Sequence, residues 1–113
     1  MRVNTNFTLI VDVQDEIDGV KTSFEYGFRS YKNTIKLYWF EVFAKYSRYE
    51  NYAPEYHSLL YLSNSYTRNH YGGKNECKLP KIPGLKKLKS LNQVEVPDNV
   101  LDAAYNKLKR IKQ

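Results

Sequence analysis

An Asp18-Gly19 pair between two stretches of alternating apolar and polar residues constrains the fold more than any other feature. Before the pair, every second residue is apolar, at Phe7, Leu9, Val11 and Val13. Residues 20–28 after the pair alternate in the same way. Asp-Gly is a preferred sequence for two-residue hairpin turns, because both residues tolerate a positive φ angle. The pattern therefore predicts an N-terminal β-hairpin over about residues 5–31, with one buried face.

Residues 34–49 fit two different structures. Apolar and aromatic side chains recur at helical spacing, at Ile35, Tyr38, Trp39, Val42, Phe43 and Tyr46. Glu41 precedes Lys45 by four residues, which adds a favourable ion pair on a helix. Against this, β-branched and aromatic residues suit strands, and Lys32-Asn33 could turn the chain into a third strand. The continuous stripe favours a helix, and the strand stays open as the alternative.

A second helix is predicted between Pro54 and Gly72. Pro54-Glu55 is typical of a helix start, and Gly72-Gly73 is typical of a helix end. The inward stripe of this helix would consist of Tyr56, Leu59, Leu60 and Ser63.

The C-terminal third combines a connector with a final helix. Residues 74–91 contain two prolines and a glycine and indicate an irregular connector, and residues 94–96 suit a short strand. Residues 98–112 predict a helix whose acids come early and whose basic residues come late, as the helix dipole prefers. Together, the patterns predict one α+β domain over residues 1–113, with a small antiparallel sheet and two to three helices packed on one face.

The net charge of +6 is unevenly distributed along the chain. Residues 1–73 form a neutral, Tyr-rich body with eight Lys/Arg and eight Asp/Glu. Residues 74–113 hold ten Lys/Arg and four Asp/Glu, which accounts for the whole excess. A basic segment attached to a neutral body indicates a docking surface for an anionic partner.

Metal and disulfide chemistry have little support. A single cysteine, Cys77, excludes an intramolecular disulfide and any site built from several cysteines. On the predicted helix, the thirteen residues from His57 to His70 would span about 20 Å, too far to share a metal ion. We therefore expect no metal site and no cofactor.

One enzymatic alternative needs neither metal nor cofactor. In this hypothesis the protein is a small, toxin-like ribonuclease, with His70 as the proton shuttle and Arg68 and Lys74 as phosphate-binding cations. The same residues equally suit a polar helix end, so the non-enzymatic interpretation is preferred.

Nucleic-acid binding has more candidate residues than catalysis. Those expected to contact phosphates are Lys74, Lys78, Lys81, Lys86, Lys87, Lys89, Lys107, Lys109, Arg110 and Lys112. A second set would contact protein or stack on unpaired bases, and consists of Tyr46, Tyr49, Tyr52 and Tyr56. Tyrosines at this spacing are also typical of a core. No helix-turn-helix, zinc-finger or RNA-recognition signature is present, so sequence-specific recognition is not expected.

These patterns favour a small non-enzymatic binding or inhibitor protein whose basic C-terminal segment docks on nucleic acid or a nucleoprotein complex. The chain is rich in Lys, Asn and Tyr and poor in Ala, a bias that the AT-rich genomes of phages and mobile elements produce. A pure protein–protein adaptor is a further alternative. No apolar run approaches the roughly 18 residues that span a bilayer, and no signal-peptide pattern opens the chain. We therefore expect a cytoplasmic protein without stable membrane association.

Overall fold

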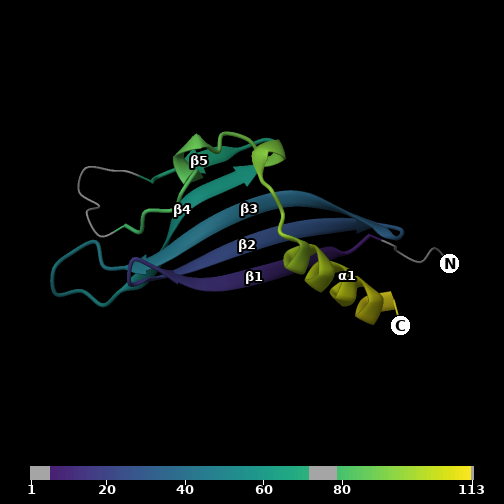
Figure 1. Ribbon diagram of the computed structural model, residues 1–113, viewed down its shortest axis with the longest axis horizontal. Coiled ribbons are helices and arrows are strands. Elements are labelled where there is room, and N and C mark those ends of the chain that lie inside the picture. Colours follow the sequence, from purple (N-terminus) through teal and green to yellow (C-terminus); the bar gives the residue numbers. More distant parts are fainter. Residues whose placement is uncertain (1–5, 72–78, 113) are drawn as a thin grey trace.

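The computed structural model describes residues 6–71 and 79–112, and its centre is a five-stranded antiparallel sheet (Figure 1). The strands lie side by side in chain order: β1 (Thr8–Ile17), β2 (Val20–Tyr31), β3 (Thr34–Tyr46), β4 (Glu55–Ser63) and β5 (Thr67–Asn69). Two short 3-10 turns, η1 (Leu85–Lys87) and η2 (Leu91–Gln93), precede a single α-helix, α1 (Asp98–Lys112). The molecule is elongated, with extents of 56 × 26 × 26 Å.

The predicted N-terminal hairpin is confirmed. β1 and β2 pair in antiparallel register from Thr8 opposite Arg29 to Ile17 opposite Val20. The two residues between the strands both have positive φ angles, 52° at Asp18 and 76° at Gly19. This conformation matches the right-handed twist of the flanking strands. The final helix is also confirmed, over residues 98–112.

The helix predicted over residues 34–49 is wrong, because residues 34–46 form strand β3. Its buried side chains alternate with exposed ones, but the phase changes once along the strand. A bulge opposite Gly27 and Phe28 inserts Tyr38 as an extra residue between Leu37 and Trp39. Inward-facing positions are therefore odd-numbered before the bulge and even-numbered after it. A strand with such a phase change produces spacings of three and four residues, which resemble a helical stripe.

The helix predicted from Pro54 is also wrong, because this segment forms β4 and β5. A second bulge, between Val42 and Phe43 of β3, makes Leu59 the extra residue of β4. Leu59 and its neighbour Leu60 are both fully buried, although successive side chains of a regular strand point to opposite faces of the sheet. Residues 94–96 are not a strand. The described chain therefore has one α-helix rather than the two to three expected.

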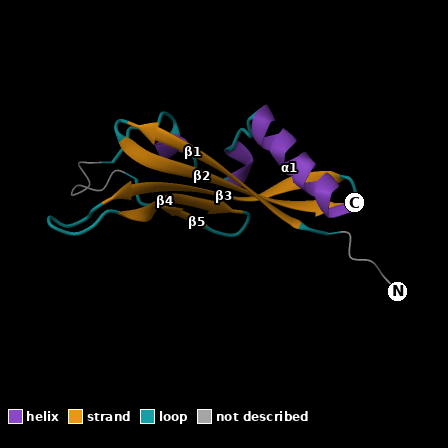
Figure 2. Ribbon diagram, turned by 90° about the horizontal axis from the view of Figure 1, so that it is seen from below, coloured by secondary structure: helices purple, strands orange, loops and turns teal. Residues whose placement is uncertain are grey.

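The C-terminal segment covers one face of the sheet and completes the core (Figures 1 and 2). α1 lies across β1 and β2 and buries Val100, Ala104 and Leu108, while η2 contacts β3. Leu85 of η1 and Leu91 of η2 are buried in the same cluster. The sheet contributes Leu9, Val11, Tyr26, Phe28, Phe40, Val42, Leu60 and Leu62. We call the opposite side of the sheet the open face.

Candidate nucleic-acid interface

The basic segment predicted to be a docking tail is the layer that covers the sheet. Its leucines face the core, and its charged side chains face solvent. Of the ten predicted phosphate-binding residues, Lys74 and Lys78 lie outside the described residues. The other eight are all exposed: Lys81, Lys86, Lys87, Lys89, Lys107, Lys109, Arg110 and Lys112.

These eight residues belong to two groups over different parts of the sheet. Lys81, Lys86, Lys87 and Lys89 lie in the connector around η1, and the other four lie in the last turns of α1. η2, at the end of the connector, contacts β3, whereas α1 contacts β1 and β2. We call the first four residues the connector lysines.

Two lysines of α1 form hydrogen bonds with β1 and with the β2–β3 turn. Lys107 Nζ donates a hydrogen bond to the backbone carbonyl of Ile10 on β1, at 2.7 Å. Lys112 Nζ donates to the carbonyl of Lys32 and to Asn33 Oδ1, the latter at 2.7 Å. The end of α1 is therefore held beside β1 and the β2–β3 turn. These hydrogen bonds give the two lysines a structural role besides their charge.

The sheet adds basic residues at the same end of the molecule. Arg29, Lys32 and Lys36 are exposed on β2, the following turn and β3. Residues 6–10, 28–37 and 105–112, which we call the basic end, contain seven Lys/Arg and no Asp or Glu. The seven are Arg29, Lys32, Lys36, Lys107, Lys109, Arg110 and Lys112, and every one is exposed. Arg29 and Lys36 lie on the open face, whereas the α1 residues lie on the covered face, so the positive charge extends around this end of the molecule. Such a region of one sign attracts polyanions and accelerates their association.

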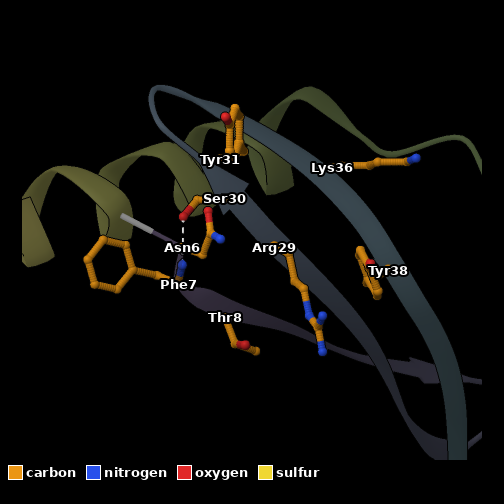
Figure 3. A pocket seen from close by; sticks show the side chains of 8 residues that line it. All are labelled: Asn6, Phe7, Thr8, Arg29, Ser30, Tyr31, Lys36 and Tyr38. Atoms are coloured by element: carbon orange, nitrogen blue, oxygen red, sulfur yellow. Dashed lines mark hydrogen bonds between the residues drawn. The ribbon is translucent and has the colours of Figure 1, made fainter. Parts of the chain in front are cut away.

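A shallow hollow of about 350 Å³ lies in the basic end, on the open face (Figure 3). Its lining includes Arg29 and Lys36, which are direct cross-strand partners. The guanidinium carbon of Arg29 lies 4.3 Å from the centre of the Tyr38 ring, a cation–π contact. Tyr31, 62% exposed, lies on the side of Arg29 nearer the turn. The remaining lining residues are Asn6, Phe7, Thr8 and Ser30.

The bulge in β3 places Tyr38 in this hollow. Gly27 faces Trp39 across the strands, and a Cβ atom on Gly27 would lie 2.0 Å from Trp39 Cε2. The indole ring therefore lies directly over the glycine backbone. Trp39 Nε1 also donates a hydrogen bond to Glu25 Oε2 at 2.9 Å. With Trp39 fixed in this way, the extra residue Tyr38 turns toward Arg29, as residues at bulges commonly do beside binding sites.

An acidic row crosses the middle of the sheet on the open face, beyond the hollow. Asp12, Glu25 and Glu41 are successive cross-strand neighbours on β1, β2 and β3. From Glu25 to Arg29 is four residues along β2, or about 13 Å at the rise of a strand. Glu41 is paired with Arg68, and the negative charge of Asp12 and Glu25 in the middle of the sheet disfavours a polyanion there relative to the basic end.

Of the three residues in the ribonuclease hypothesis, the structure describes Arg68 and His70. Arg68 forms an ion pair with Glu41 at 3.3 Å and also donates to Ser58 Oγ at 3.1 Å. His70 is exposed just beyond β5, and its backbone N–H donates to the Leu59 carbonyl. Lys74 lies outside the described residues. The Arg68 guanidinium is thus already paired with a carboxylate instead of facing an open phosphate site.

The structure also changes the reasoning about metals. His57 and His70 lie on and beside neighbouring antiparallel strands, so the helical separation of about 20 Å does not apply. The His57 ring instead contacts the Tyr46 ring, with centres 4.5 Å apart. Among the described residues, no group of His, Cys, Asp or Glu could hold a metal ion. Cys77 lies outside those residues.

The four tyrosines predicted as a contact surface differ in exposure: one is buried and three are exposed. Tyr46 is buried at the end of β3, whereas Tyr49 and Tyr52 are 68% and 70% exposed in the β3–β4 loop. Their rings meet edge to face, with centres 5.7 Å apart. Tyr56 is exposed on β4, with Lys45 Nζ 5.7 Å from its ring centre.

Comparison with protein-family models, with curated proteins and with solved structures finds no match to this chain. Within residues 6–71 and 79–112, no helix is long and apolar enough to cross a membrane.

The contribution of the sheet to the basic end was not predicted from the sequence. Arg29, Lys32 and Lys36 belong to a body whose basic and acidic residues are equal in number, so its total charge gives no signal. A local signal does exist, because residues 26–40 contain three cations and no acid. It becomes meaningful only when the β2–β3 turn is recognised and α1 is placed beside it.

Proposed function

We propose that the protein is a non-enzymatic nucleic-acid-binding protein that contacts phosphates with its basic end. One observation carries the proposal: seven exposed Lys/Arg from three separate segments gather at one end, where the described chain has no acid. Phosphate contacts of this kind supply most of the affinity in sequence-independent binding. The proposal moves the interface away from the connector lysines, which lie over another part of the sheet.

A charge-matched pair of variants tests this location. The first changes four cations of the basic end to Gln: Arg29, Lys36, Lys109 and Arg110. The second changes the four connector lysines to Gln, which removes the same total charge from a different surface. Lys107 and Lys112 stay unchanged in both, because their hydrogen bonds to the sheet support the fold.

Binding is measured by fluorescence anisotropy with labelled single-stranded and duplex DNA, at about 50 and about 200 mM salt. We expect the wild-type affinity to fall by about a hundredfold or more over this range, as it does when several phosphates are neutralised. The basic-end variant should bind at least about tenfold more weakly at low salt and show a shallower salt dependence. The connector variant should stay within about threefold of wild type.

Two results would contradict the proposal. Absence of wild-type binding at low salt would exclude direct recognition of nucleic acid. A larger loss in the connector variant than in the basic-end variant would return the interface to the connector. Thermal unfolding followed by circular dichroism checks that both variants stay folded.

A further inference from the structure

We infer that the hollow at Arg29 and Lys36 binds a dinucleotide unit of single-stranded nucleic acid, with the phosphate between the two cations and the flanking bases against Tyr31 and Tyr38. The inference rests on the proposed function, and adds that the basic end distinguishes single strands from duplexes. The two cations suit the phosphate of this ligand, and the two tyrosine rings suit its bases.

Within the part of the chain that the structure describes, the pair of cations lacks a partner of opposite charge. Arg29 and Lys36 are directly opposite each other on β2 and β3, and like charges in this position destabilise a sheet. Neither forms an ion pair within the described residues, and no residue lining the hollow is acidic. A phosphate between them would neutralise this repulsion, and the planar Arg29 guanidinium suits a phosphate well. The Thr8 hydroxyl also lines the hollow and adds a hydrogen-bond donor.

Aromatic rings flank these cations on both sides. Tyr31 follows Arg29 by two residues on β2, so both side chains belong to the open face. Tyr38 follows Lys36 by two residues on β3, and the bulge keeps its ring beside Arg29. Figure 3 shows the two tyrosines at separate places around the hollow, with Arg29 beside Tyr38 and the Lys36 side chain directed away from Arg29. Lys36 is exposed, so its ammonium group can turn inward to meet a phosphate held by Arg29. A phosphate with a base on either side matches this order of ring, cation and ring.

The class of nucleic acid follows from the rings. Tyrosine stacks on the flat face of a base, and in a duplex that face is covered by the neighbouring base pairs. Only an unpaired strand can offer bases to both rings while its phosphate contacts the cations. Because the acidic row begins about 13 Å from Arg29, the bound stretch on this face is short.

The test compares two double variants that differ only in which exposed tyrosines they lose. Tyr31→Leu/Tyr38→Leu removes the ring faces of the hollow and leaves every charge in place. Tyr52→Leu/Tyr56→Leu is the matched control, since it removes two exposed rings elsewhere, and Lys45 lies over the Tyr56 ring as Lys32 lies over the Tyr31 ring. The probes are a labelled oligothymidylate of about 12 nucleotides and a duplex of the same length.

We expect the Tyr31/Tyr38 variant to lose at least about tenfold in affinity for the single strand, because stacking contributes substantially for each base. Its duplex affinity and its salt dependence should stay unchanged. The Tyr52/Tyr56 control should bind both probes as wild type does. Circular dichroism and thermal unfolding establish that both variants are folded.

Three outcomes would overturn the inference. The first is equal loss for single strand and duplex in the Tyr31/Tyr38 variant, and the second is no loss for either. The third is a selective loss in the Tyr52/Tyr56 control, which would place stacking at the β3–β4 loop and the start of β4. Each leaves the proposed function intact if the wild type still binds nucleic acid, whereas absence of wild-type binding contradicts the proposed function itself.

Discussion

Gly27 is the residue on which the geometry of the open face depends. It faces Trp39, and the indole ring occupies the space that any larger side chain would need. The bulge that presents Tyr38 lies at the same point of the sheet. A change at Gly27 should therefore affect both stability and the shape of the hollow.

We predict that Gly27→Ala lowers the free energy of unfolding by about 1–3 kcal/mol, because the added methyl group overpacks against Trp39. Urea unfolding of the variant and the wild type measures this change. In a Trp39→Leu background the cost should be clearly smaller, since the rigid ring is gone. An equal cost in both backgrounds would show that Trp39 is not the obstacle.

Tyr26 gives the fold a dependence on alkaline pH. It is buried in the core beside Phe40, with ring centres 5.0 Å apart. Burial raises the pKa of its hydroxyl above the usual value of 10.0, because the phenolate is poorly solvated there. Above the unfolded pKa, the unfolded chain releases a proton that the folded protein retains. This contribution to stability is complete below pH 10 and is lost as the pH rises through the folded pKa.

We therefore predict that the free energy of unfolding falls between pH of about 9 and about 11, and that Tyr26→Phe makes the fall shallower. Urea unfolding at several pH values in this range measures the slope. Tyr49→Phe is the control, because it removes an exposed tyrosine hydroxyl instead of a buried one. The same slope in the Tyr26 variant and the wild type would refute the explanation.

At the scale of elements, α1 is stabilised by its contacts with the sheet more than by its own sequence. Its buried side chains, at Val100, Ala104 and Leu108, follow helical spacing and lie against β1 and β2. Lys107 and Lys112 add hydrogen bonds to the backbone of the sheet. Short helices are marginal in water without such packing.

We predict that Leu108→Ala lowers the free energy of unfolding by about 2–5 kcal/mol, since Leu108 is almost fully buried. Ile111→Ala, one turn later and 45% exposed, should change it by less than about 1 kcal/mol. Urea unfolding of the two variants gives the comparison. Similar losses of stability in both variants would show that Leu108 is not more deeply packed than Ile111, and would contradict the prediction.

The strands show why sequence periodicity succeeded for one pair and failed for the others. β1 and β2 pair without a bulge along the faces predicted from sequence, and their turn has a strong local signal at Asp18-Gly19. β3 and β4 each contain a bulge. At each bulge, the inward-facing side chains change between odd-numbered and even-numbered residues. A bulge depends on what the partner strand offers, such as the absent side chain of Gly27, and a single segment does not encode that.

At the scale of the whole molecule, folding sorts charges that are mixed along the chain. The eight acids of residues 1–73 all lie outside the basic end, and Arg29, Lys32 and Lys36 lie within it. The molecule is 56 Å long, several times the Debye length at physiological salt, so its two ends act as separate electrostatic surfaces. An anionic partner should therefore approach one end first, which the charge-matched variants above examine.

The sequence by itself determined the hairpin, the final helix and the excess of positive charge in the last third, because each depends on residues close together in the chain. Only the tertiary structure decided that residues 34–46 and 55–69 are strands, because their phase changes follow from pairing with neighbours. It also decided which cations form a surface. Arg29 and Lys36 join Lys109 and Arg110 because the β2–β3 turn and the end of α1 pack together, and such proximity depends on distant contacts.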